Sequence, residues 1–349
     1  MGPTDAAGIL RPQSTSSRGA YDHTRDRYRS GPEATVAQAL RRFAEGDAAS
    51  TPGPGLGRTW ERFGTLATVA AGNLSVARLI EGHLDALAIL AEAGVAPRPG
   101  ATYGVWAARS GTGGLRAQPV AGGWRLTGSK AFCSGARMLD RALVTAEAED
   151  GYRLFDIDVS EQVISLVPAS WAAVGMADSA SETLVIGGPA VPDAAAVGAP
   201  DFYTNRPGFW FGAVGVAACW YGGALGLVKG IVEQMSASDP HALTEIGRAE
   251  AQVQAMRDVL RAEAGRIDAD PADERHRARA GALAVRELVH QLCTEVLREV
   301  AAAGGARPLC HDAEQAQRSA DLYVYLSQHH GARDAAELGR LAVEERKWS

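Results

Sequence analysis

The stretch Gly123-Trp124-Arg125-Leu126-Thr127-Gly128-Ser129-Lys130-Ala131-Phe132-Cys133-Ser134-Gly135-Ala136 carries the strongest structural signal in the chain. Its first half alternates apolar and polar side chains and contains a glycine, which predicts a β-hairpin with its turn at Gly128-Ser129. Its second half places an aromatic residue, a small residue and a hydroxyl, Phe132-Cys133-Ser134, shortly after a lysine. An ordinary hairpin explains the alternation, but it does not explain this order of residue types.

Size and composition limit the classes of protein to consider. The chain has 349 residues, of which 46% are hydrophobic and 22% charged, as is typical of soluble proteins with two or three domains. Its net charge of −6 argues against nucleic acid as a partner. The cysteines are widely separated, which predicts reduced thiols in a cytoplasmic protein and neither a disulfide framework nor a metal site. They are Cys133, Cys219, Cys293 and Cys310.

One segment is long and apolar enough to cross a bilayer. The run from Phe209 to Val228 holds no charged residue, but it contains several glycines and has no second apolar span to accompany it. We therefore expect a buried helix and no membrane span. The N-terminus has no apolar segment of the signal-peptide type, so no secretory signal is expected.

The pattern of side chains divides the chain into four parts. Residues 1–33 are rich in Gly, Ser, Pro, Arg and Asp, which predicts a disordered tail. Residues 34–98 show helical periodicity and predict a shortened N-terminal helical domain. Within it, Asn73 is the expected N-cap and Gly94 the expected C′ residue of one helix. Residues 99–200 contain short strand-like runs separated by turn residues, which predicts a middle β domain of sandwich or barrel type.

The last part, residues 201–349, returns to helical periodicity and is rich in alanine. Long helices joined by short loops predict an antiparallel four-helix bundle. The expected helices cover residues 207–236, 242–267, 273–303 and 312–327, with a final helix at 332–345. The predicted class is therefore an α+β protein with three structured domains.

The residue order from Gly123 to Ser134 resembles the flavin-contacting strand of the acyl-CoA dehydrogenase superfamily, G-x-x-L-x-G-x-K-x-aromatic-x-Ser/Thr. Further matches occur in the same order along the chain, and together they cover roughly residues 73–345. They are the helix at 73–94, the strand at 103–111, the segment Trp171–Thr183, the small-residue helix around 215–218, and Gly304-Gly305. Independent local signals that agree on one architecture favour this fold.

The resemblance implies an FAD site. Ser134 matches the hydroxyl residue that bonds the N5 edge of the flavin, and Phe132 matches an aromatic residue that packs on the ring. Trp171 either stacks on the ring or fills the core. The resemblance also assigns to the cofactor Cys133, the backbone of Val105, Trp106 and Ala107, and the pair Gly304 and Gly305.

The chain departs from the family pattern at several positions around the cofactor. Ala107-Ala108-Arg109 stands in place of Thr-Glu-Pro. Ser238-Asp239-Pro240-His241 occupies the loop where the family has Arg-x-x-Phe-Gly, which approaches the adenylate from a neighbouring subunit. Ala301 replaces the glutamine that precedes the glycine pair.

The catalytic glutamate of the dehydrogenases is also replaced. One alignment puts His330, next to His329, at its position, and an ungapped alignment puts Ser327 there; we prefer the first. A histidine could act as a neutral base or could handle oxygen, as in the monooxygenase branch of the superfamily. Alternatively, both histidines only make hydrogen bonds across the bundle. Glu233 and Glu245 are reserve candidates for the base, although surface exposure is the simpler explanation for both.

Three functions remain open. The first is an FAD-dependent α,β-dehydrogenation of an acyl thioester, with hydride transfer to flavin N5. The second is a flavin-dependent monooxygenase of the same fold, acting on another small substrate. The third is a degenerate member that serves as a binding or assembly partner. The resemblance also implies a homodimer or homotetramer.

Overall fold

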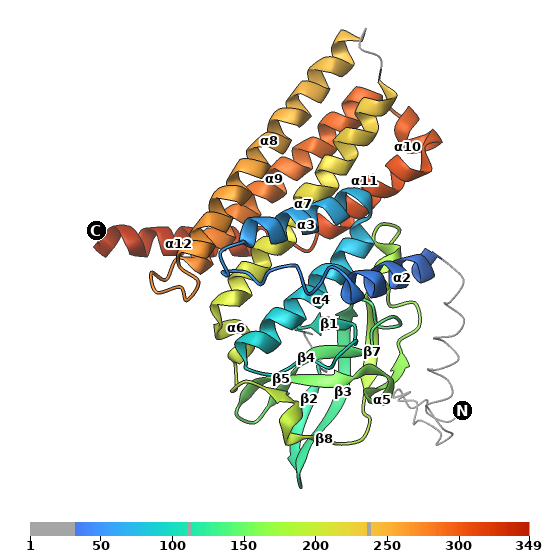
Figure 1. Cartoon of the computed structure of the whole chain (residues 1–349). Helices are drawn as coiled ribbons and strands as arrows, with labels where there is room; N and C mark the ends of the chain where they lie inside the picture. Colours follow the sequence, from blue (N-terminus) through green and yellow to red (C-terminus); the bar gives the residue numbers. More distant parts are fainter. Residues whose placement is uncertain (1–31, 110–113, 236–238, 349) are drawn as a thin grey trace, which may run out of the picture.

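The computed structural model describes residues 32–109, 114–235 and 239–348, and its elements follow one another as helices, strands and helices (Figure 1). The α+β class is confirmed. The predicted disordered tail, residues 1–33, lies outside the described residues except for Pro32 and Glu33, which begin the first described helix.

The N-terminal helices form where the periodicity predicts them. Asn73 caps its helix, because its side-chain oxygen accepts a hydrogen bond of 2.9 Å from the Val76 N–H. Gly94 has a left-handed backbone with φ of 68°, as a C′ residue requires. The helices are α2 (Pro32–Glu45), α3 (Thr59–Gly72) and α4 (Leu74–Glu92).

The strands form one connected mixed sheet in the order β6-β7-β3-β2-β4-β5-β9, with β1 parallel to β4 and β8 beside β3. Their bounds are β1 (Tyr103–Trp106), β2 (Arg116–Val120), β3 (Gly123–Cys133), β4 (Arg141–Ala148), β5 (Gly151–Asp158), β6 (Val163–Leu166), β7 (Glu182–Ile186), β8 (Val191–Pro192) and β9 (Ala196–Val197). Short helices α5 (Val159–Gln162), η2 (Ala177–Ser179) and η3 (Asp193–Ala195) interrupt them.

The predicted turn at Gly128-Ser129 is wrong. Strand β3 continues through Gly128, pairing with β2 before it and with β7 after it. The φ of Gly128 is 132°, and a Cβ there would lie 2.5 Å from the Gly114 carbonyl oxygen. The glycine therefore serves a close backbone approach where the strand changes partners, and the hairpin turn falls between β2 and β3.

The C-terminal part consists of long helices, of which α7, α8 and α9 run side by side (Figure 1). Helix α11 packs against α7 and α9, and α3 packs against α7 and α8. The helices are α6 (Phe202–Asn205), α7 (Pro207–Gln234), α8 (Pro240–Ala269), α9 (Ala278–Gly304), α10 (Arg307–His311), α11 (Ala313–Leu326) and α12 (Ala332–Trp348).

Helix α7 is the apolar segment considered as a membrane span. It is long and apolar enough, but 78% of its most apolar window is buried within the fold. Its glycines meet other elements closely: a Cβ on Gly222 would lie 2.3 Å from the Ala67 carbonyl oxygen of α3. Packing against α3 therefore explains both its apolar character and its small residues.

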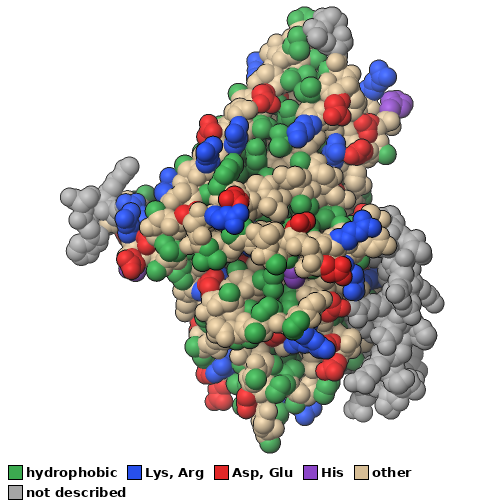
Figure 2. Space-filling model, in the orientation of Figure 1, with side chains coloured by type: hydrophobic (Ala, Val, Ile, Leu, Met, Phe, Trp, Pro, Cys, Tyr) green, Lys and Arg blue, Asp and Glu red, His purple; other side chains and the backbone are tan. Residues whose placement is uncertain are grey.

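Acidic and basic side chains alternate over the face of the molecule shown in Figure 2, and hydrophobic atoms appear between them. Inside, one continuous apolar cluster includes Leu84 of α4, Trp106 of β1, Val214 of α7 and Tyr325 of α11. The helices and the sheet are therefore packed on a common core.

His83 joins α4 to the sheet. Its Nδ1 accepts a hydrogen bond of 3.2 Å from the Tyr103 N–H, and only 3% of the residue is exposed. Burial lowers the pKa of His83 to about 4.

We therefore predict a loss of stability in acid that depends on His83. Between its ordinary pKa of about 6.5 and the lowered value, the unfolded chain binds a proton that the folded chain does not, so stability falls as pH falls. The contribution of His83 is about 3 kcal/mol over this window. Denaturant unfolding at pH 7 and pH 4 measures this effect. The free energy of unfolding should decrease less between the two pH values for His83→Gln than for the wild type. The exposed His241 provides the control: His241→Gln should behave as the wild type. Equal pH dependence of His83→Gln and wild type would contradict this account.

Candidate active site

The motif that opened the sequence analysis lies at a break in the pairing of β3. The register with β7 shifts between Lys130 and Cys133, and Phe132 has a left-handed backbone with φ of 57°. Such a bulge redirects side chains, and this φ costs an aromatic residue roughly 1–2 kcal/mol. Phe132 is 63% exposed, whereas Cys133 and Ser134 are buried. Strain of this kind persists mainly at functional sites.

Ser134 belongs to a chain of buried hydroxyls. Its Oγ lies 2.7 Å from Ser181 Oγ, which lies 2.9 Å from Ser179 Oγ. The Ser179 hydroxyl in turn donates to the Met176 carbonyl at 2.8 Å. None of these serines is more than 7% exposed. The chain connects the end of β3 to the segment that precedes β7.

Trp106 and Trp171, the two tryptophans predicted for the cofactor site, contact the hydroxyl chain at opposite ends. The Trp106 indole N–H donates to the Ser134 carbonyl at 3.1 Å, and the Trp171 indole N–H donates to the Met176 carbonyl at 3.1 Å. Trp106 is buried, and Trp171, Val105 and Ala107 are half-buried. The structure thus brings together the predicted residues of β1, of β3 and of the 171–176 segment.

The segment around Met176 rests on helix α11. A Cβ on Gly175 would lie only 2.0 Å from the Ala320 carbonyl oxygen, so only glycine allows this approach. The Met176 N–H donates to Asp321 Oδ1 at 2.5 Å, and Gln317 Nε2 donates to the Val174 carbonyl at 3.2 Å. Burial raises the pKa of Asp321, and the hydrogen bonds that its carboxylate accepts from the Met176 N–H and from Gln317 Nε2 oppose the shift.

The two predicted histidines have different surroundings. The side chain of His329 is 1% exposed, and its Nε2 lies 2.7 Å from Glu287 Oε2. The side chain of His330 is 65% exposed, and its Nδ1 lies 3.6 Å from Asp334 Oδ2. The same Asp334 oxygen lies 3.7 Å from His329 Nδ1. Since burial and a carboxylate partner fix the orientation of an imidazole, His329 is the better-positioned acid–base group.

Aromatic rings surround His329. Its ring centroid lies 4.8 Å from that of His290 and 6.0 Å from that of Trp220. Among the described residues, the Trp220 indole nitrogen and His329 Nδ1 have no hydrogen-bond partner. Buried polar atoms without partners in the protein are places where a water molecule or a ligand group belongs.

Glu287 and His290 were missed by the sequence analysis. They lie three residues apart on α9, the spacing that puts two side chains on one helix face, and this was the available signal. The hydrogen bond with His329 lowers the pKa of Glu287, and burial lowers that of His290. Of the reserve candidates, Glu233 is exposed and Glu245 pairs with Arg248 on its own helix.

Helix α11 connects the two groups of residues. Asp321 bonds the Met176 segment, and Tyr325, one turn further along, packs edge-on against Trp220. His329 follows three residues after the helix ends. In the part of the chain that the structure describes, no three His, Cys, Asp or Glu side chains are placed to hold a metal ion.

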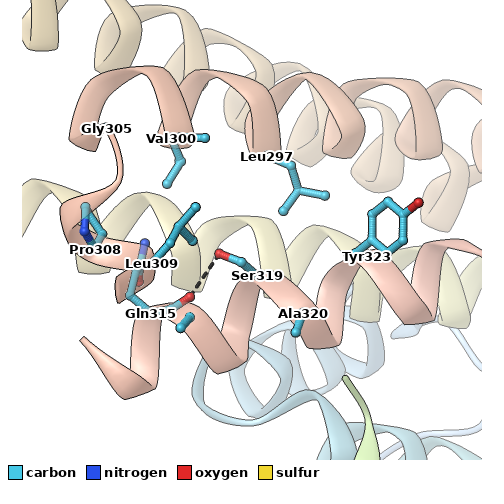
Figure 3. Close-up of a pocket in the computed structure, with 11 residues that line it drawn as sticks. Leu297, Val300, Gly305, Pro308, Leu309, Gln315, Ser319, Ala320 and Tyr323 are labelled. Atoms are coloured by element: carbon cyan, nitrogen blue, oxygen red, sulfur yellow. Dashed lines mark hydrogen bonds between the residues drawn. The ribbon is translucent and has the colours of Figure 1, made fainter. Parts of the chain in front are cut away.

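Gly304 and Gly305 lie at the end of α9, beside a cavity of about 420 Å³ between α9, α10 and α11 (Figure 3). Gly304 allows close contact with Pro308, where a Cβ would lie 2.4 Å away. Leu297 and Val300 of α9 face Ala320 and Tyr323 of α11 across the cavity, whose lining is mostly apolar. Gly305 therefore borders this cavity, and Gly304 packs on Pro308 beside it.

The geometry can be compared with known proteins. The chain matches no protein-family model and no curated protein sequence. Solved structures do match over nearly its whole length. The dibenzothiophene monooxygenase TdsC from Paenibacillus sp. A11-2, in complex with FMN and indole, is 18% identical with a TM-score of 0.76, over 94% of this chain and 95% of that one. The chain shares its fold with TdsC, which is consistent with the predicted acyl-CoA dehydrogenase-like fold.

Two further similar structures are also of monooxygenases. The methanesulfinate monooxygenase MsuC from Pseudomonas fluorescens is 16% identical with a TM-score of 0.70, over 90% of this chain and 97% of that one. The HsaA monooxygenase from M. tuberculosis is 17% identical with a TM-score of 0.68, over 94% and 95%. At these identities the likeness shows the fold alone.

The close approach at Gly175 gives a prediction. Gly175→Ala should destabilise the protein by roughly 3 kcal/mol, because its Cβ would meet backbone that cannot move alone. Gly64→Ala is the matched control, since its Cβ would meet nothing within 4 Å in helix α3. That change should be neutral or stabilise by about 0.5–1 kcal/mol. Thermal unfolding measures both, and an unaffected Gly175→Ala would contradict the described contact with α11.

Proposed function

We propose that this protein is a flavin-dependent monooxygenase that uses FMN. The observation that carries the proposal is the exposed ring of Phe132 beside the buried hydroxyl of Ser134. The similar solved structures include monooxygenases, and TdsC and KijD3 were each solved with FMN, which supports a flavin for this fold.

The residues present fit a flavin. An isoalloxazine ring has a flat apolar face and a polar edge, so it needs an aromatic or aliphatic surface next to hydrogen-bonding groups. Phe132 offers the apolar surface and Ser134 the hydrogen-bonding group, and the two residues lie two positions apart at the bulged end of β3. When bound, reduced flavin supplies the activation of oxygen.

FMN suits this chain better than the predicted FAD. The adenylate of FAD needs polar partners, and this chain has neither the arginine nor the glutamine that the family provides at the matching positions. Ala301, where the family has a glutamine, lines the mostly apolar cavity beside Gly305. FMN carries no adenylate and needs no such contacts.

In this proposal His329 is the acid–base residue. An Nε2–H donated to Glu287 leaves a lone pair on Nδ1, which accepts no hydrogen bond among the described residues and lies 3.7 Å from Asp334 Oδ2. The Trp220 N–H beside it is a second free polar group. Together they can hold a polar substrate group and move its proton.

Dehydrogenation of an acyl thioester has less support. It would require a base for the α-proton, and the loop after α11 offers His329 and His330 in place of a carboxylate. We also propose a homo-oligomer, since Val174 and Tyr323 remain exposed next to the segment that packs on α11.

Flavin binding tests the proposal. Under anaerobic conditions we expect one reduced FMN to bind per chain, with an affinity lowered about tenfold in Phe132→Ala, because an aromatic contact contributes roughly 0.5–1.5 kcal/mol. Tyr323→Ala is the matched control, an exposed aromatic residue that lines the α9–α11 cavity. If FAD bound instead and an acyl-CoA bleached it, dehydrogenation would replace this proposal. A larger loss in Tyr323→Ala would move the flavin to the cavity.

The Glu287–His329 pair gives a second prediction. In nitrogen-15 NMR spectra near pH 8, His329 should carry its proton on Nε2, because Glu287 accepts it. Glu287→Gln keeps an acceptor and should preserve this tautomer, whereas Glu287→Leu should abolish the preference. An Nδ1-protonated His329 in the wild type would rule out the proposed role of Nδ1.

A further inference from the structure

The hydroxyl chain from Ser134 contains as many hydroxyl hydrogens as close O···O contacts. Its three O···O distances, Ser134–Ser181, Ser181–Ser179 and Ser179 to the Met176 carbonyl, are 2.7, 2.9 and 2.8 Å. Two oxygens this close require a hydrogen between them. Each serine hydroxyl supplies one hydrogen, so every hydroxyl hydrogen in the chain is used.

The carbonyl at the end fixes the direction of the whole chain. The Met176 carbonyl has no hydrogen, so Ser179 must donate to it. Ser181 must then donate to Ser179, and Ser134 must donate to Ser181. The hydrogen of Ser134 is therefore committed, and its oxygen can only accept a hydrogen bond from any further partner.

The end of the chain is held firmly. The Met176 carbonyl also accepts from the Trp171 indole N–H and from the Ser179 N–H, both at 3.1 Å. Rotating the peptide group that contains the Met176 carbonyl away from the hydroxyl chain would break all of these hydrogen bonds. Ser179 and Ser181 are 1% and 4% exposed, so water has little access to replace them.

We propose that Ser179 and Ser181 make the flavin site selective for the reduced cofactor by fixing Ser134 as an acceptor. The inference rests on the proposed function, in which Ser134 faces N5. Reduced flavin carries a hydrogen on N5 and can donate it to Ser134, whereas oxidised N5 has only a lone pair. Ser179 and Ser181 act through Ser134 and are positioning residues.

Binding of FMN in both redox states tests this. Fluorescence titration of oxidised FMN and anaerobic titration of reduced FMN should give the wild type a preference of roughly tenfold or more for the reduced form, since one hydrogen bond is gained and one repulsion avoided. A tenfold ratio corresponds to a rise of about 30 mV in the two-electron midpoint potential of bound FMN.

Two variants, at residues that do not contact the ligand, should reduce the preference for reduced over oxidised FMN by about tenfold. Ser181→Ala frees the hydrogen of Ser134, and Ser179→Ala frees that of Ser181, which can then donate to Ser134. In both, oxidised FMN should bind more tightly. Ser165→Ala, an exposed serine on β6, is the control and should keep the ratio of the wild type.

The outcomes separate the two claims. Equal affinity of the wild type for both redox states, or an unchanged ratio in both Ser181→Ala and Ser179→Ala, would overturn the selectivity. A folded wild-type protein that binds FMN in neither state would overturn the proposed function itself.

Discussion

The peptide groups on both sides of Met176 are the constraint on which the site depends. The N–H bonds Asp321 of α11, and the carbonyl ends the hydroxyl chain from Ser134. Gly175 lets the backbone reach α11 at this point. Residues about 145 positions apart, Met176 and Asp321, are thereby fixed relative to one another. Among the described residues, it is the Met176 carbonyl that gives the Ser134 hydrogen its direction, through Ser179 and Ser181.

The same helix relates the two halves of the site. One face of α11 bonds the Met176 segment through Asp321, and its end positions Tyr325 and then His329 beside Trp220. Glu287 fixes the His329 ring from α9. The strand residues that suit a flavin and the histidine that suits proton transfer are therefore connected by rigid elements, as a site with defined geometry requires.

Much of the architecture could be predicted because it follows from local patterns. Helical periodicity located α4 and α7, and Asn73 and Gly94 act as the predicted caps. The turn at Gly128 could not be predicted correctly, since a glycine that permits close strand packing looks the same in sequence as one that turns the chain.

The candidate site was predictable only in part. Phe132 and Ser134 belong to a contiguous motif, so their sequence order sufficed to select them. Glu287 and the serines at 179 and 181 act through contacts between distant segments. The spacing of Glu287 and His290 shows only that they share a helix face and does not reveal the contact with His329. Choosing between His329 and His330 requires knowing which side chain is buried, and neighbouring residues in a loop do not reveal that.

The central claim is that reduced FMN binds against Phe132 with its N5 edge at Ser134. A crystal structure of the protein grown anaerobically with reduced FMN tests it most directly. The account predicts an isoalloxazine ring packed on the Phe132 side chain, with N5 within hydrogen-bond distance of Ser134 Oγ. A flavin bound in the cavity between α9 and α11, or a site at Phe132 that stays empty while FMN is present in excess, would contradict it.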